Sequence, residues 1–235
     1  MLKELDYIKR IVECYQFVNR VENHALTPHA QMCIAKEMTD ELRETTKEIL
    51  SNPKMFLKPP TEDDIDRMYA KIEEQYFTNL NKAARYLSWV YNYSLVMMCG
   101  IFDAFLEDSM EVALRHSSPT EPLLSLVTNY LKVFSKKDLK SRLQDYEHVL
   151  GISQKEFFDF SLFTQDIQDK YKVFNQEKLR EIYAKRIAAA HSDQVVISKE
   201  ELVMVSDVLQ KIMINLSQKI GNKSGIPTQL KELAS

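Results

Sequence analysis

The sequence predicts an all-α protein, an irregular up-and-down helical bundle that carries extra helices at its N-terminus. Apolar residues recur at three- and four-residue spacing along most of the chain, whereas the strict alternation of a half-buried strand is almost missing. Proline, glycine and capping residues separate the periodic segments. With 235 residues, of which 45% are hydrophobic and 28% charged, the chain is long enough to bury a sizeable core.

The first two expected helices occupy residues 2–24 and 28–50. The first has one amphipathic stripe, and the second begins with Thr27 as N-cap and Pro28 in the first helical turn. Three prolines between residues 51 and 60 are incompatible with a continuing helix. A run of acids after Thr61 then favours the start of a long helix that reaches residue 116.

Shorter helices are expected in the second half of the chain. Gly151 is expected to close one of them, and Ser198 with Glu201 forms a capping box for the last, which we expect to end at Gly221. The expected helices span residues 120–134, 136–150, 153–168, 176–191 and 199–221.

The same pattern predicts the domain organisation. Residues 1–79 are expected to be a helical elaboration packed on a core bundle of residues 80–221, and residues 222–235 a polar tail. The most apolar stretch, residues 86–106, is long enough to span a bilayer but contains polar residues, among them Asp103. We therefore expect a central bundle helix and no membrane association.

Composition and charge exclude several classes of protein. Four glycines cannot form the glycine-rich loops of dinucleotide enzymes or P-loop NTPases. The formal charge of −3 means that any polyanion site must be a local patch. Cys14, Cys33 and Cys99 are predicted to be buried free thiols, and no metal-binding motif or cofactor is expected. Without a secretory signal pattern, we expect a cytoplasmic protein.

Arg186 is the most informative residue of the predicted helix 176–191. It falls within a face formed by Leu179, Ile182, Tyr183 and other apolar residues. Because arginine is rarely buried without a partner, it is predicted either to form an internal salt bridge or to hold a phosphate in a groove. His191 lies about 140° further round this helix. The two side chains converge only if the helix frays or a second subunit supplies half of the site.

At these residues the chain resembles the HEPN superfamily, all-helical domains named for nucleotide binding in higher eukaryotes and prokaryotes. The family's hallmark is an arginine followed after four to six residues by a histidine, here Arg186-Ile-Ala-Ala-Ala-His191. Many members have Asn or Asp after the arginine, where this chain has Ile187. The apolar segment 100–106, which contains Asp103, is similar to the family's second core helix. The resemblance covers about residues 80–220.

The resemblance implies a metal-independent endoribonuclease, acting as a toxin or in antiphage abortive infection, whose sites form across a two-fold dimer. Arg186 is then expected to bind the scissile phosphate and His191 to transfer protons, while the RNA 2′-OH is the nucleophile. Asp103 and Lys185 are expected as supporting residues, although Asp103 also fits a solvated or capping role. The implied partners are RNA (tRNA or mRNA), a second copy of the chain, and an antitoxin or regulatory protein.

Two clusters of basic residues are compatible with RNA binding, although solvated helical faces have the same composition. The first cluster is Lys132, Lys136, Lys137, Lys140 and Arg142, and the second is Lys170, Lys172, Lys178, Arg180 and Lys185. Near the second cluster, Tyr171 and Phe174 are candidates for stacking on unpaired bases.

A second interpretation is a catalytically silent helical bundle that serves as a protein-interaction or nucleotide-binding accessory module. The two interpretations differ in their geometry. A nuclease requires Arg186 and His191 to reach an open groove at a two-fold interface. A silent bundle requires Arg186 to be paired internally and His191 to face solvent.

Overall fold

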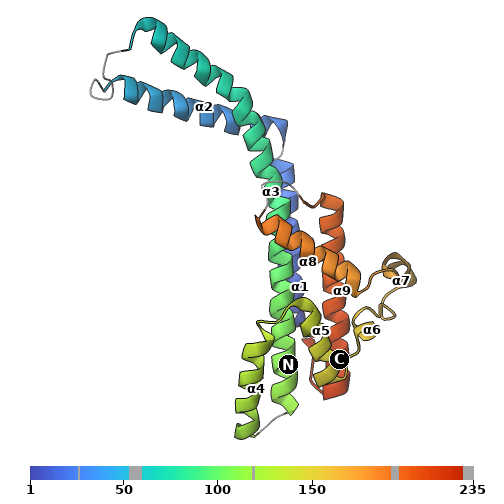
Figure 1. The fold of residues 1–235 in the computed structure, drawn as a ribbon. Coiled ribbons are helices and arrows are strands. Elements are labelled where there is room, and N and C mark those ends of the chain that lie inside the picture. Colours follow the sequence, from blue (N-terminus) through green and yellow to red (C-terminus); the bar gives the residue numbers. More distant parts are fainter. Residues whose placement is uncertain (26, 53–59, 118–119, 192–195, 230–235) are drawn as a thin grey trace. The chain divides into compact units, whose positions relative to one another are not determined.

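The computed structural model confirms the all-α helical bundle. It describes residues 1–25, 27–52, 60–117, 120–191 and 196–229. Within these residues the β-structure consists of one isolated bridge between Leu2 and Thr228. The helices are α1 (Glu4–His24), α2 (Pro28–Leu50), α3 (Glu62–Ser117), α4 (Glu121–Phe134), α5 (Leu139–Leu150), α6 (Gln154–Phe157), α7 (Gln165–Tyr171), α8 (Gln176–His191) and α9 (Lys199–Ser224) (Figure 1).

The chain forms two compact units. Unit 1 contains Met1–Gln16 and Tyr91–Ser235, and unit 2 contains Phe17–Val90. These bounds differ from the predicted ranges 1–79, 80–221 and 222–235, because α1 and α3 each run without a break through a boundary between the units.

Unit 2 contains the end of α1, α2 and the first half of α3, and α2 lies beside this half of α3 (Figure 1). The buried Asn79 amide donates to the Thr39 hydroxyl at 3.2 Å, and Arg43 forms an ion pair with Glu73. The predicted cap of α2 is confirmed, since the Thr27 hydroxyl accepts from the Ala30 amide at 3.2 Å. Part of the predicted proline-rich break, residues 53–59, lies outside the described residues.

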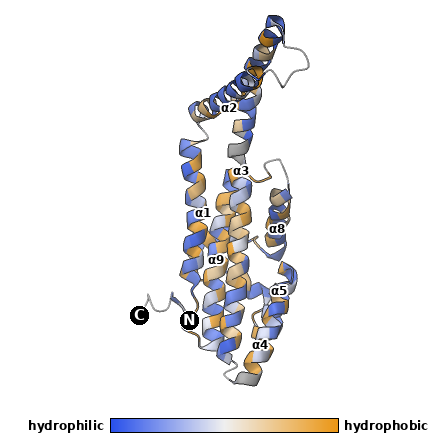
Figure 2. Ribbon diagram, turned by 90° about the vertical axis from the view of Figure 1, so that its left-hand side faces the viewer, coloured by the Kyte–Doolittle hydropathy of each residue, from blue (hydrophilic) through white to orange (hydrophobic). Residues whose placement is uncertain are grey.

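The core of unit 1 is formed mainly by residues 91–117 of α3 and by α9. Along α9 nearly every turn buries apolar side chains, and Figure 2 shows hydrophobic residues frequent on both helices. Shorter helices add aromatic residues: Tyr146 of α5 is fully buried and donates to the Leu106 carbonyl at 2.6 Å. The Tyr7 ring packs edge-on against Phe105, which joins the start of α1 to α3.

One described segment, Trp89–Ser117, is long and apolar enough to cross a membrane. Half of its most apolar window is buried inside the fold. The segment also contains Asp103 and Glu107, whose carboxylates pair with arginines of other helices. Its composition is therefore explained by its central place in unit 1.

Two expectations about local structure were wrong. The single helix expected over residues 153–168 is two short helices, α6 and α7. The Asn215 side chain of α9 donates to the Phe157 carbonyl at 3.2 Å, so this carbonyl is held by a tertiary contact where α6 ends. The last helix continues past Gly221 to Ser224 and ends at Gly225, which has the left-handed φ of 68° that favours glycine. The remaining residues of the predicted tail, 230–235, lie outside the described residues.

Two further capping predictions are confirmed, although α1 begins at Glu4 and not at residue 2, and α5 at Leu139 and not at residue 136. Gly151 follows α5 with a left-handed φ of 64°, as expected for a C-cap glycine. The capping box of α9 is formed in both directions: the Ser198 hydroxyl accepts from the Glu201 amide, and the Ser198 amide donates to the Glu201 carboxylate. Residues 192–198 connect the end of α8 to this capped final helix, and residues 192–195 lie outside the described residues.

Candidate functional site

Arg186 lies on α8 and is paired with a carboxylate of the central helix. Its Nη1 donates to Asp103 Oδ2 at 2.6 Å, while 31% of the arginine side chain stays exposed. The helix is fixed from its start, because the Asn175 side chain accepts from the amides of Glu177 and Lys178. An ion pair to Asp103 restricts the rotamers of Arg186 without removing its other N–H groups from solvent.

Asp103 accepts from two further donors. The Tyr183 hydroxyl donates to Asp103 Oδ1 at 2.8 Å, and Arg142 Nη1 approaches the same oxygen at 3.3 Å. Burial raises the pKa of Tyr183 well above its ordinary value, and the charge of Asp103 adds to this rise. Tyr183 therefore remains a neutral donor, and the Arg186 guanidinium lies 5.5 Å from the centre of its ring. Three donors from α5 and α8 thus converge on one carboxylate of α3.

Arg142 ties the connection between α4 and α5 to α3. It is 7% exposed, and its guanidinium donates to the Ser135 carbonyl at 2.6 Å and the Lys137 carbonyl at 3.0 Å. The same group pairs with Glu107 at 3.0 Å. Burial raises the pKa of Glu107, which the Arg142 charge opposes. A buried arginine with carboxylate and carbonyl partners has a structural role and is not a mobile surface charge.

An open groove of about 550 Å³ runs over these residues. Its walls come from α8, the start of α5 and the loop that precedes α5. Six cationic side chains face only two carboxylates there, although the chain as a whole carries a formal charge of −3. We call this site the basic groove; it is lined by Asp103, Ser135, Lys136, Lys137, Asp138, Leu139, Lys140, Arg142, Arg180, Tyr183, Ala184, Arg186 and Ile187.

The cations of the basic groove differ in how they are neutralised. Lys137 pairs with Asp145 at 2.6 Å. Lys136, Lys140 and Arg180 are exposed and form no ion pair within the described part of the chain. Of the two carboxylates, Asp103 is occupied by its arginines. Asp138 is the N-cap of α5, and the hydrogen bond from the Ser141 amide, at 2.8 Å, lowers its pKa.

His191 does not line the basic groove. It is the last residue of α8 and is exposed. Together with the exposed Ala184, Ile187 and Ala188 it forms one outer face of the helix, since these residues are spaced by three and four positions. Ile187, which follows Arg186, is 63% exposed. The described chain therefore brings Arg186 and Asp103 together and leaves His191 apart from them.

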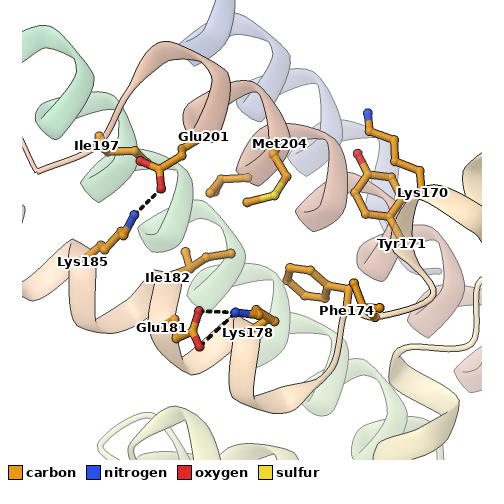
Figure 3. A pocket seen from close by; sticks show the side chains of 12 residues that line it. Lys170, Tyr171, Phe174, Lys178, Glu181, Ile182, Lys185, Ile197, Glu201 and Met204 are labelled. Carbon is orange, nitrogen blue, oxygen red and sulfur yellow. Dashed lines mark hydrogen bonds and ion pairs between the residues drawn. The ribbon is translucent and has the colours of Figure 1, made fainter.

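Lys185 lies in a different pocket, of about 340 Å³, between α7, α8 and α9. Figure 3 shows its ammonium group paired with Glu201 across this pocket, and Lys178 paired with Glu181. Lys185 is therefore not part of the basic groove.

The base-stacking expectation for Tyr171 and Phe174 is not supported, because the two side chains are only 3% and 7% exposed. Both line the pocket of Lys185, and the Tyr171 hydroxyl donates to Asp207. Their packing accounts for their presence.

The role of Arg142 in fixing Asp103 was missed by the sequence analysis, which placed Arg142 only in a basic cluster. A signal was present in the spacing of Asp103 and Glu107. Two acids four residues apart in an apolar helix share one face and require a cationic partner when the helix is central.

Metal-binding clusters of His, Cys, Asp and Glu are not found within the described residues. The three cysteines are free, but the expectation that all are buried was wrong. Cys99 is buried and Cys14 partly so, whereas Cys33 is exposed on the outer side of α2, where its sulfur lies 3.7 Å from His29 Nε2.

Comparison with known proteins adds no relative, because no family model, curated protein or solved structure matches the chain significantly. The similarity drawn from Arg186 and His191 therefore rests on these residues and their surroundings.

Proposed function

We propose that the chain is a metal-independent endoribonuclease of the HEPN type that binds RNA at the basic groove. The observation that carries the proposal is Arg186, held by Asp103 at 2.6 Å and partly exposed in a groove with six cations. A guanidinium with its rotamer fixed by a carboxylate is pre-organised for a phosphate, because less side-chain freedom is lost on binding.

In the proposed reaction the 2′-OH of the RNA attacks the adjacent phosphorus. A bond forms between the 2′ oxygen and phosphorus, and the bond from phosphorus to the 5′ oxygen breaks. One imidazole removes the proton of the 2′-OH and an acid returns a proton to the leaving 5′ oxygen, so the products are a 2′,3′-cyclic phosphate and a 5′-OH. Arg186 stabilises the additional negative charge on the phosphoryl oxygens.

A second copy of the chain completes this site in the proposal. His191 does not line the basic groove of its own chain, but it shares a face of α8 with Ala184 and Ile187, which do. Ile187, which follows Arg186 and lines the groove, is 63% exposed, so a second copy packed at this place would bury its apolar side chain. We therefore propose a homodimer in which α8 packs near its own symmetry mate and histidine reaches the groove across the two-fold axis.

The proposed setting is a toxin or an antiphage abortive-infection system in the cytoplasm. RNA, either tRNA or mRNA, is the proposed substrate, and an antitoxin or regulatory protein restrains the activity. The reaction as written uses neither a metal ion nor a cofactor, because nucleophile, acid, base and phosphate ligand all come from RNA and side chains.

A catalytically silent bundle is the second candidate function, as a protein-interaction or nucleotide-binding accessory module. Two observations favour it: Arg186 has an internal partner in Asp103, and His191 is exposed and does not line the groove. In this case the Arg186 and Asp103 pair joins α8 to α3 and performs no chemistry.

Cleavage of total cellular RNA in EDTA separates the two candidates. The wild type, Arg186→Ala and His191→Ala are compared, with His148→Ala as a matched control, because His148 is also exposed but lies on α5 outside the groove. The proposal expects cleavage by the wild type and the control and none by the other two, with equal far-UV circular dichroism for all four. Cleavage that survives both substitutions contradicts the site, and an inactive wild type favours the silent bundle.

A further inference from the structure

Three exposed cations of the basic groove, Lys136, Lys140 and Arg180, form no ion pair in the described part of the chain. The backbone hydrogen bond at the start of α5 lowers the pKa of Asp138 most, and the charges of Lys140 and Arg180 lower it further. This single carboxylate leaves the three cations with an excess of positive charge. They come from two segments about 40 residues apart in sequence, the corner between α4 and α5 and the helix α8. Their convergence is not required for folding, because unpaired exposed cations of like sign repel one another and contribute little to stability.

The corner that presents the two lysines is held in a defined place. The guanidinium of Arg142 fixes the backbone on both sides of Lys136, because it donates to the carbonyls of Ser135 and Lys137. Asp138 caps α5 immediately before Lys140. The lysines therefore project from a backbone that is tied to Asp103 and Glu107 of the core helix through Arg142.

The arginines of the groove are separated along α8. Arg180 precedes Arg186 by six residues, which corresponds to about 9 Å along a helix axis. Cations distributed over this length and over a second wall suit several phosphates of one chain better than the single phosphate of a mononucleotide. The groove is open and has a volume of about 550 Å³, and the spacing of its cations, not its volume, favours a strand over a mononucleotide.

We propose that Lys136, Lys140 and Arg180 form a binding track for the backbone of single-stranded RNA that leads to Arg186. The inference rests on the proposed function, because it assigns the strand whose phosphate Arg186 receives. The track reads charge and not sequence, since lysine and arginine contacts to phosphates position a strand without discriminating its bases.

Binding of a 12-nucleotide single-stranded 2′-O-methyl RNA in EDTA tests the track. This probe lacks the free 2′-OH and is not cleaved in the proposed reaction. Fluorescence anisotropy compares the wild type with the triple variant Lys136→Ala, Lys140→Ala and Arg180→Ala. The matched control is Lys3→Ala, Lys9→Ala and Lys155→Ala, three exposed lysines of unit 1 that do not line the groove and belong to neither basic cluster.

The track predicts a loss of affinity of about ten-fold or more in the triple variant and none in the control. It also predicts that the slope of log K against log salt falls by about 2, because each phosphate contact to a single strand contributes about 0.7. The wild type should bind the 12-mer more tightly than a dinucleotide or a duplex of equal length. Unchanged affinity in the triple variant, or equal binding of a dinucleotide or of a glutamate-rich peptide of equal charge, would overturn the inference.

The cleavage assay distinguishes failure of the track from failure of the proposed function. If the wild type binds the 12-mer as expected but does not cleave natural RNA, the binding track is supported and the nuclease proposal is contradicted. If the wild type cleaves RNA in an Arg186-dependent way and the triple variant binds and cleaves equally well, the nuclease proposal is supported and the binding track is contradicted.

Discussion

Arg186 and Asp103 are 83 residues apart in the sequence, and their side chains meet at 2.6 Å between α8 and α3. The arginine is about one third exposed, so the pair contributes little to stability by itself. Its main consequence is geometric. Asp103, which Tyr183 and Arg142 also hold, fixes where the guanidinium stands in the basic groove.

The substitution Asp103→Asn should separate positioning from binding. An amide retains the shape but loses the charge that holds Arg186, so RNA cleavage is expected to fall by about 10–100-fold. Binding of the 12-mer RNA at Lys136, Lys140 and Arg180 should change by less than about three-fold, since Arg142 keeps Glu107 and two backbone carbonyls as partners and still holds the corner of the two lysines. Asp145→Asn is the control, because Asp145 pairs with Lys137 and not with Arg186. Wild-type cleavage by Asp103→Asn would contradict a positioning role.

Arg142 should matter for stability more than any other cation of the groove. Replacement by Met removes the ion pair of Glu107, the donor of two backbone carbonyls and one of the three donors of Asp103, and the free energy of unfolding should fall by about 2–4 kcal/mol. Arg180→Met, the same substitution at an exposed residue of this groove, should change it by less than about 0.5 kcal/mol. Urea unfolding followed by circular dichroism measures both. Equal midpoints for the two variants would show that Arg142 is not a structural element.

Glu156 should contribute to the pH dependence of stability. The hydrogen bond from the Ser153 amide, at 2.7 Å, lowers the pKa of Glu156, while its partial burial opposes and Lys223 supports this shift. A carboxyl whose pKa is lower in the folded state stabilises the fold above its ordinary pKa of 4.5, and this contribution disappears as pH falls through the folded value.

Glu156→Gln should therefore lower the free energy of unfolding by about 1 kcal/mol at pH 7 and by progressively less below pH 4.5. Glu147→Gln, at an exposed position of α5, serves as the control. Urea titrations between pH 3 and pH 7 measure the difference. A difference between the wild type and Glu156→Gln that stays constant over this range would refute the assignment.

Cys99 should be unreactive in the native protein. The pKa of its thiol is raised to about 12, chiefly by burial; the Arg186 charge opposes this rise and the Asp103 charge adds to it. Almost no thiolate therefore exists at pH 8. In the double variant Cys14→Ser and Cys33→Ser, an aromatic disulfide reagent should react with Cys99 only after denaturant is added. The exposed Cys33 should react at once in the wild type. Rapid labelling of Cys99 without denaturant would show that this part of α3 opens readily.

Much of the fold could be predicted from local sequence, because helix periodicity and capping residues act over a few positions. Ser198 and Glu201, for example, form the expected capping box. The expectations that were wrong depend on distant contacts. Residues 153–168 have helical periodicity, but the side chain of Asn215, far along the chain, takes the Phe157 carbonyl and α6 ends there.

The candidate site was only partly accessible from the sequence for the same reason. Arg186 could be identified because a cation on an apolar helical face needs a partner, and Asp103 because an acid inside an apolar helix does too. The meeting of Lys136 and Lys140 with Arg180 depends on how α5 packs beside α8, which no spacing within either helix encodes. Lys185 had suitable charge but faces Glu201 in the neighbouring pocket.

Cleavage of two oligonucleotides of one sequence, one with ribose and one with 2′-deoxyribose at every position, tests the central claim most directly. Both are incubated in EDTA with the wild type and with Arg186→Ala. The account predicts that the wild type cuts only the ribose strand, leaving 2′,3′-cyclic phosphate and 5′-OH ends, and that Arg186→Ala is slower by about 100-fold or more. An intact ribose strand, cutting of the deoxyribose strand, or equal rates for both proteins would contradict it.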